Sequence, residues 1–150
     1  MIVVADTGGI IEAIDDTAPR HDAFRAVLER PDLDVRITPL VMTEVHYLLS
    51  AAGAQDVAAA FLEDVTAGFY RVESPAVADL SNAASLIARY RTAMARRRPK
   101  PGGLDLADAV NVAVAARLET NIIIATDQDY RQLSPLSHHK YFLLWPDDLD

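Results

Sequence analysis

Short apolar runs alternate with helical patterns along the whole chain. Five of these runs predict strands, at Ile2–Ala5, Val35–Thr38, Phe69–Glu73, Ile122–Thr126 and Lys140–Trp145. The stretches between them predict helices, at Pro19–Arg30, Val41–Ala52, Asp56–Ala67, Ala76–Arg97 and Asp105–Leu118. Strands that alternate with helices are typical of βαβ units, so we expect an α/β fold on a mostly parallel sheet.

In two of the predicted strands, the runs IVVA from residue 2 and IIIA from residue 122 show no alternation with polar residues. This is the pattern of a strand that helices cover on both faces. The segment PKPGG at residues 99–103 breaks the pattern, and we interpret it as a loop because the remainder of the chain is too short to fold alone. A length of 150 residues then fits one domain, 1–150.

Composition narrows the class of protein. The chain is 51% hydrophobic and 24% charged, which excludes an intrinsically disordered chain. No apolar run approaches the roughly 20 residues of a membrane-spanning helix. No basic region precedes the apolar start at Met1, so we expect no signal peptide and a cytoplasmic protein. The absence of cysteine excludes disulfides, thiolate catalysis and cysteine-ligated zinc.

The net charge of −8 argues against non-specific binding of nucleic acid, but the charge is unevenly distributed. Residues 89–100 contain no acid and carry six bases, Arg89, Arg91, Arg96, Arg97, Arg98 and Lys100. One interpretation is an RNA-binding surface with Tyr90 available for stacking. The others are a solvated helix end whose bases complement the helix dipole, or a docking surface for an acidic partner.

Four acidic residues are expected at one edge of the predicted sheet. Asp6 and Asp127 directly follow predicted strands. Glu44 and Asp108 lie in the first turns of helices that begin at the same edge. Ligands of open parallel sheets bind at the carboxyl ends of the strands, so we expect these four carboxylates to converge.

Convergence of four carboxylates has an energetic consequence. Two like charges 4 Å apart cost about 4 kcal/mol at an effective dielectric constant of 20. The four acids therefore need raised pKa values or a divalent cation among them. An all-oxygen site selects Mg²⁺ or Mn²⁺ over zinc and suits phosphodiester hydrolysis by an activated water.

Each acid also has a purely structural interpretation. Asp6 can cap a helix that starts near Gly9. In the sequence DLAD we take Asp105 as the helix cap and Asp108 as the ligand. The TDQD turn can also be only a helix N-cap, and it leaves the fourth acid open between Asp127 and Asp129. For the whole chain, the alternatives are a phosphatase with an Asp nucleophile and a catalytically inactive module that binds RNA or protein.

Four segments, in this order, resemble the PIN-domain ribonucleases, and among them the VapC-type toxins of VapBC toxin–antitoxin pairs. The segments are VVADTGGII, TPLVMTEVHYLL, LDLADAVNVAVAARL and IIIATDQDYRQL. The resemblance implies a three-layer α/β/α fold with a five-stranded sheet. It also implies Mg²⁺- or Mn²⁺-dependent endoribonuclease activity, a homodimer and a VapB-type antitoxin as partner.

The resemblance also implies roles for single residues. Asp6, Glu44, Asp108 and Asp127 fall on the family's acidic quartet, which is catalytic and binds the metal. Thr126 falls on the family's threonine before the fourth acid. Further supporting candidates are Thr7, beside Asp6, and two acids that their position places at the same edge, Asp105 and Asp129. The family often carries a small hydroxyl residue where this chain has Gly8. We therefore expect a supporting hydrogen bond to Asp6 or to the metal to be missing here or to come from Thr7.

Overall fold

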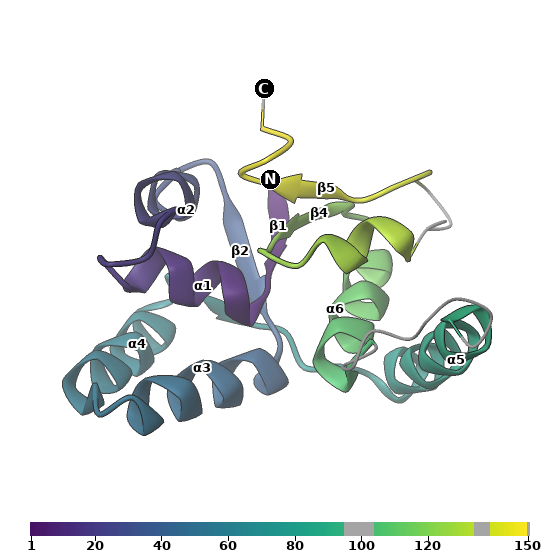
Figure 1. The fold of residues 1–150 in the computed structure, drawn as a ribbon, viewed down its shortest axis with the longest axis horizontal. Coiled ribbons are helices and arrows are strands. Elements are labelled where there is room, and N and C mark those ends of the chain that lie inside the picture. The colour runs from purple at the N-terminus through teal and green to yellow at the C-terminus, as the bar shows by residue number, and fades with distance from the viewer. Residues whose placement is uncertain (95–103, 134–138, 150) are drawn as a thin grey trace.

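The computed structural model describes residues 1–94, 104–133 and 139–149 and contains one five-stranded sheet (Figure 1). Its strand order is β3-β2-β1-β4-β5, and all four pairings are parallel. The strands are β1 (Ile2–Ala5), β2 (Asp34–Ile37), β3 (Arg71–Val72), β4 (Ile122–Ile124) and β5 (Leu143–Trp145). The predicted parallel α/β architecture is therefore confirmed.

Helices cover both faces of this sheet (Figure 1). One layer contains α1 (Thr7–Ile14), α2 (His21–Leu28), α3 (Pro39–Ala51) and α4 (Gln55–Ala67). The other contains α5 (Val77–Met94) and α6 (Leu106–Arg117), and a 3₁₀ helix, η1 (Gln128–Gln132), follows β4. Within the described part of the chain, no helix is long and apolar enough to cross a membrane.

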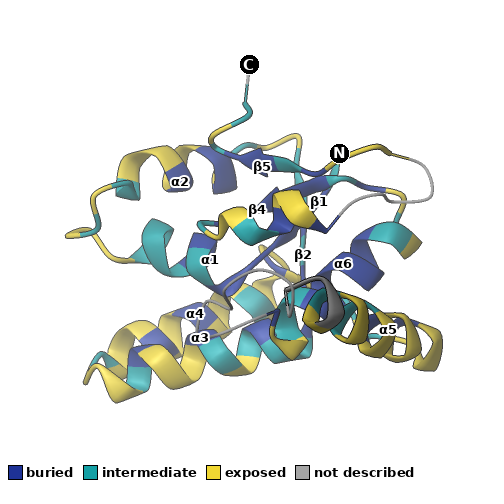
Figure 2. Cartoon of the chain, turned by 45° about the vertical axis from the view of Figure 1, so that its right-hand side comes forward, coloured by how far each residue is buried: buried dark blue, intermediate teal, exposed yellow. Residues whose placement is uncertain are grey.

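Alternation along the strands divides the core in two. Val3 and Ala5 of β1 pack into the core under α1–α4, whereas Val4 packs into the core under α6. Ile122 and Ile124 of β4 belong to the same core as Val3, and the residue between them belongs to the same core as Val4. Both faces are covered, which explains why these strands contain no polar positions. Figure 2 shows the result, with β1, β4 and most of α6 buried and much of α4 and α5 exposed.

The periodicity of the sequence does not predict the first helix, α1. The segment is short and begins TGG, and glycine is a poor helix former, so its pattern is weak. Gly9 is required here by close packing, since a Cβ atom at this position would lie 2.5 Å from the carbonyl oxygen of Ile124. The absence of a side chain lets α1 pack directly against the end of β4.

The other predicted elements differ from the structure mainly at their ends. The last strand begins at Leu143, not at Lys140, and β3 has only two residues. The predicted helix Ala76–Arg97 corresponds to α5, and its residues after Met94 lie outside the described part of the chain.

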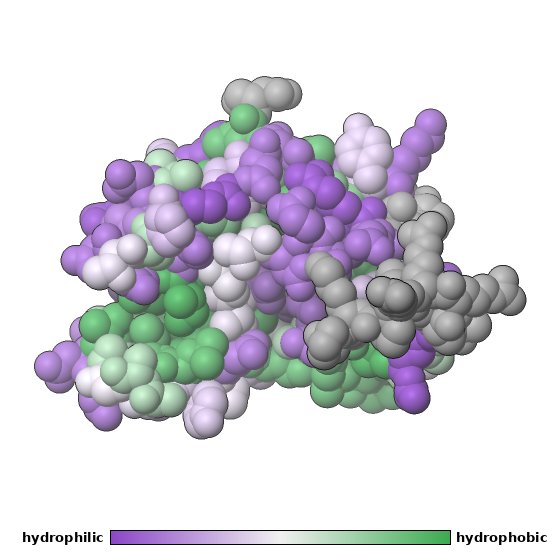
Figure 3. Space-filling view, in the orientation of Figure 1, coloured by the Kyte–Doolittle hydropathy of each residue, from purple (hydrophilic) through white to green (hydrophobic). Residues whose placement is uncertain are grey.

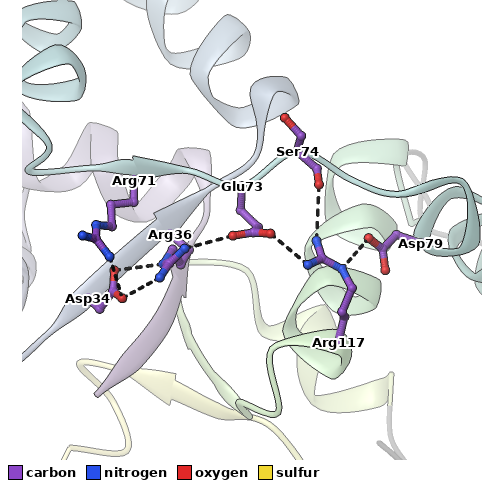
Figure 4. A network of polar contacts seen from close by, with 7 residues as sticks. All are labelled: Asp34, Arg36, Arg71, Glu73, Ser74, Asp79 and Arg117. Atoms are coloured by element: carbon purple, nitrogen blue, oxygen red, sulfur yellow. Dashed lines mark hydrogen bonds and ion pairs between the residues drawn. The ribbon is translucent and has the colours of Figure 1, made fainter.

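A network of ion pairs joins β2, the segment after β3, and α6 (Figure 4). Arg36 pairs with Asp34 at 2.6 Å and with Glu73 at 3.0 Å, and Arg117 pairs with the same Glu73 at 2.8 Å. Arg117 also pairs with Asp79 at 2.8 Å, a carboxylate that is almost fully buried. The network anchors the last residue of α6, the helix whose first turn carries Asp108.

The surface is mixed in character. Figure 3 shows hydrophilic side chains over the middle of the face seen in Figure 1 and an apolar area to their left, between α1 and α4.

Candidate active site

The strand order reverses between β1 and β4, and the site lies at the carboxyl ends of these two strands. In open α/β sheets, ligands bind where the order reverses in this way. Asp6 directly follows β1, and its backbone N–H donates to the carbonyl oxygen of Ile124 at 2.9 Å. Asp6 is only 7% exposed. Near the lower end of β1 in Figure 1, α1, α3 and α6 all begin.

Glu44 reaches this edge from α3. Thr38 begins the helix as its N-cap, accepting a hydrogen bond from the backbone of Val41, and Pro39 occupies the first turn. The hydroxyl of Thr7 donates to Oε2 of Glu44 at 2.7 Å. Thr7 thus connects α1 to α3, and its side chain supports Glu44, whereas the sequence suggested support for Asp6 or the metal.

Asp105 and Asp108 divide the roles of cap and site residue on α6. The side chain of Asp105 accepts a hydrogen bond from the backbone N–H of Asp108 at 2.8 Å, so Asp105 is the N-cap, as predicted. Asp108 is half-buried, and its Oδ1 accepts a hydrogen bond from the hydroxyl of Tyr130 at 2.9 Å. One acid therefore starts the helix and the other faces inward.

Asp127 and Asp129 lie at the start of η1. Asp127 is exposed and caps this helix by accepting from the backbone N–H of Asp129 at 2.8 Å. Asp129 is half-buried and accepts from the hydroxyl of Tyr90 at 3.3 Å. Asp127 has the cap role that the sequence offered as its alternative, but capping engages only one of its two carboxylate oxygens.

Burial and like charge perturb two carboxyl groups of the site. Burial, with the neighbouring charge of Asp108 and smaller contributions from Asp105 and Glu44, raises the pKa of Asp6 to about 7. Burial and the charges of Asp105 and Asp127 raise the pKa of Asp108 to about 6, against the hydrogen bond from Tyr130. Raised values of this kind are typical of functional sites.

No cation offsets this negative charge among the residues that the structure describes. The ion pairs found there involve neither Asp6 nor Glu44, Asp108 or Asp127. The site therefore combines several carboxylates with a shortage of positive charge. An all-oxygen donor set of this kind fits Mg²⁺ or Mn²⁺.

The acids share an electrostatic field, but they do not form a closed cluster. Within residues 1–94, 104–133 and 139–149, no three His, Cys, Asp or Glu side chains lie close enough to hold one metal ion. Separate hydrogen bonds hold the acids: Thr7 holds Glu44, Tyr130 holds Asp108, and Asp127 caps η1. The sequence predicts that the four carboxylates converge closely. In the structure they lie at the same edge of the sheet but do not contact one another as a cluster.

Asn111 and Tyr130 contact the acids and were missed by the sequence analysis. The side-chain amide of Asn111 donates to Oδ1 of Asp6 and to the hydroxyl oxygen of Tyr130, both at 3.1 Å. Asn111 is fully buried in the otherwise apolar stretch AVNVAVAA. A lone amide in such a stretch needs a buried partner, and this is the signal that could have identified it.

Thr126 lies against the backbone of Gly8. A Cβ atom on Gly8 would collide with Oγ1 of Thr126. The threonine hydroxyl therefore fills the space in which a side chain at position 8 would begin. Thr126 therefore places a hydroxyl beside position 8, where this chain has no side chain.

The basic segment is described only in part. Arg89 and Arg91 lie on the last turns of α5 and are exposed. Arg96, Arg97, Arg98 and Lys100, which the sequence offers as RNA contacts, lie outside the described residues.

A groove of about 730 Å³ borders the acids between the first turns of α3 and α6. Glu44 and Asp105 lie on it, and most of the remaining lining is apolar, including Leu40, Tyr47 and Leu106. A volume of this size is in the range of small-ligand sites. A mostly apolar groove thus lies beside the acidic residues at this edge of the sheet.

The sheet order, the two helical layers and the acids at the carboxyl edge define a PIN-like fold. The chain belongs to the PIN domain family, which matches residues 3–135. This confirms the resemblance seen in the sequence.

Particular relatives are VapC proteins. The chain is 22% identical over 143 residues to the ribonuclease VapC26 of Mycobacterium tuberculosis, covering 95% of this chain and 99% of that protein. The structure is similar to that of the sarcin–ricin loop cleaving toxin VapC20 of the same organism, with a TM-score of 0.64, 18% identity, and coverage of 92% and 98%. It is also similar to VapBC2 of Rickettsia felis bound to a promoter DNA fragment, with a TM-score of 0.61, 14% identity, and coverage of 93% and 96%.

Proposed function

We propose that this protein is a metal-dependent endoribonuclease and the toxin of a VapBC-type toxin–antitoxin pair. The observation that carries the proposal is the buried carboxylate of Asp6 at the reversal of strand order, within the field of Asp108 and Glu44. Membership of the PIN family and the similarity to the ribonuclease VapC26 support the same activity. In this proposal residues 1–150 act as one nuclease domain in the cytoplasm.

In our proposal Asp6, Glu44, Asp108 and Asp127 hold Mg²⁺ or Mn²⁺. When bound, such a cation supplies Lewis-acid chemistry, offsetting charge on the scissile phosphate and making water a better nucleophile. Thr7 orients Glu44, and Asp105 starts the helix that presents Asp108. Thr126 and Asp129 support the acids from the β4 side. One carboxylate of the quartet takes the proton of the attacking water, since the side chains that contact the carboxylates of Asp6, Glu44 and Asp108 are the hydrogen-bond donors Thr7, Asn111 and Tyr130.

The substrate and partners are inferred from charge and from the relatives. RNA phosphates contact the basic segment, which comprises Arg89, Arg91, Arg96, Arg97, Arg98 and Lys100, so the acidic body binds a polyanion through one local surface. VapBC complexes of similar fold support a VapB-type antitoxin as partner. We also propose that the protein is a homodimer.

Cleavage of a structured RNA tests the activity. The purified protein is incubated with an end-labelled ribosomal RNA hairpin in Mg²⁺, in Mn²⁺ or in EDTA. We expect discrete cleavage with either metal and none in EDTA. Asp6→Asn and Asp108→Asn are expected to abolish cleavage, whereas Asp16→Asn, at an exposed turn position after α1, leaves it unchanged.

Three outcomes would contradict the proposal. Cleavage that persists in Asp6→Asn and Asp108→Asn would come from another site or from a contaminant. RNA binding without cleavage by any metal-loaded preparation would favour the inactive binding module. Rapid turnover of p-nitrophenyl phosphate, with a phosphorylated Asp6, would favour the phosphatase instead.

A further inference from the structure

A buried chain of hydrogen bonds joins two acids that are far apart in the sequence. The amide of Asn111 donates to Oδ1 of Asp6 at 3.1 Å and to the hydroxyl oxygen of Tyr130 at 3.1 Å. The Tyr130 hydroxyl in turn donates to Oδ1 of Asp108 at 2.9 Å. Asp6 and Asp108 are thus connected through two uncharged side chains.

Each donor of this hydrogen-bond chain has one defined acceptor for each of its protons. The amide group of Asn111 has two N–H bonds, and one goes to each partner. The single hydroxyl proton of Tyr130 goes to Asp108, so its oxygen is free to accept from Asn111. Thr38 completes the arrangement by donating to Oδ1 of Asn111 at 3.3 Å. Asn111 is therefore fixed from both ends and cannot rotate its amide without losing hydrogen bonds.

Packing makes the chain rigid. Asn111 is 0% exposed and Tyr130 is 1% exposed. The ring of Tyr130 packs edge-on against Phe142, with ring centroids 6.3 Å apart. Asn111 lies one turn after Asp108 on α6, so both point from the same face of that helix.

A core position does not need these polar atoms. A phenylalanine at position 130 fills nearly the same volume, and burying a hydroxyl or an amide costs free energy unless it is hydrogen-bonded. Here the polar atoms of Asn111 and Tyr130 donate hydrogen bonds to Asp6 and Asp108, two acids whose like charges repel each other. The chain engages Oδ1 of each carboxylate and leaves Oδ2 of each outside it.

We propose that Asn111 and Tyr130 are positioning residues that fix the carboxylates of Asp6 and Asp108 as a preformed pair for a divalent cation. The inference rests on the proposed function, because it assigns these acids to the metal. Neither residue touches substrate in this scheme. Their effect is exerted through the orientation of the acids, as for hydrogen-bond partners behind metal ligands in other proteins.

Tyr130→Phe tests the proposal with the smallest change, since it removes one oxygen and keeps the ring. Mn²⁺ binding is measured by calorimetry without RNA, beside thermal unfolding. We expect the dissociation constant for Mn²⁺ to rise about 10-fold or more, within the roughly 10- to 100-fold typical of such partners. The Mn²⁺ concentration that half-activates RNA cleavage should rise by the same factor, with KM for RNA unchanged.

Tyr70→Phe is the matched control. Tyr70 is also a buried tyrosine, but it belongs to the core under α1–α4, where its ring packs 5.5 Å from that of Phe61. We expect it to bind Mn²⁺ like the wild type. Asn111→Leu provides a second variant that removes both donors, and we expect it to weaken Mn²⁺ binding at least as much as Tyr130→Phe.

The possible outcomes distinguish a failure of the positioning role from a failure of the proposed nuclease activity. Wild-type Mn²⁺ affinity in folded Tyr130→Phe, with only a lower melting temperature, would show a merely structural role and overturn the inference. Failure of the wild type to bind Mn²⁺ would overturn it too. If the wild type binds Mn²⁺ but cuts no RNA, the proposed nuclease activity fails, while weaker binding by Tyr130→Phe still supports the positioning role.

Discussion

Asp6→Asn should inactivate the enzyme and also make the protein more stable. The substitution keeps the shape of the side chain and an oxygen that can accept the hydrogen bond from Asn111. It removes a negative charge from a position that is 7% exposed and close to Asp108 and Glu44. The carboxylate is thus unfavourable for folding, which is a usual property of groups placed for function.

The size of the effect can be worked out from the pKa. The pKa of Asp6 is about 7 in the folded protein, against an ordinary value of 3.8. The native state therefore binds the proton more tightly than the unfolded state, and wild-type stability falls as the pH rises from about 4 to 7. Each pH unit corresponds to about 1.4 kcal/mol, so ionised Asp6 costs up to about 4 kcal/mol at pH 8. This is a large share of the roughly 5–15 kcal/mol that stabilises a typical domain.

Urea unfolding in EDTA measures this difference, with the fluorescence of Trp145, the only tryptophan, as the probe. At pH 8 we expect Asp6→Asn to be about 2–4 kcal/mol more stable than the wild type, and at pH 4.5 by only about 1 kcal/mol. Asp16→Asn controls for the loss of one exposed acid. An Asp6→Asn variant no more stable than the wild type at pH 8, or a gain that does not depend on pH, would refute the reasoning.

Three further results are expected. Mn²⁺ should bind more tightly as the pH rises from 5 to 8, because Asp6 and Asp108, with pKa values of about 7 and 6, must lose their protons first; calorimetry that finds no pH dependence would contradict this. Gly9→Ala should lower the free energy of unfolding by about 1–3 kcal/mol, because its Cβ would lie 2.5 Å from a carbonyl oxygen of β4; unchanged urea unfolding would contradict the close packing. Asp127→Asn should weaken Mn²⁺ binding more than Asp129→Asn, and the reverse order would make Asp129 the fourth acid.

The fold could be predicted because its strands are buried on both faces. A run such as IVVA at Ile2–Ala5 admits few interpretations, and the structure has a strand with these same bounds. The position of Asp6 could then be predicted from topology, since the residue after a parallel strand lies at the carboxyl edge. The cap role of Asp105 could be predicted too, because capping is a local interaction within one turn.

The partners of the acids could not be predicted in the same way. Thr7 and Glu44 are brought together by the packing of α1 against α3, and no spacing in the sequence encodes this. Tyr130 is apolar in its ring, so in the sequence it counts as an ordinary core aromatic. Its hydroxyl acquires a role only because the fold brings Tyr130 of η1 within hydrogen-bond distance of Asp108 on α6.

The described contacts of the acids share a chemical property. Thr7, Asn111 and Tyr130 are uncharged donors, and each holds one carboxylate oxygen of Glu44, Asp6 or Asp108, respectively. An arginine in the same place would hold the carboxylate as firmly, but it would also cancel its charge and fill the space beside it. Uncharged donors fix the geometry and leave the negative field in place. The arrangement therefore favours the arrival of a mobile cation, and the same field accounts for part of the rise in the pKa values of Asp6 and Asp108, beside burial.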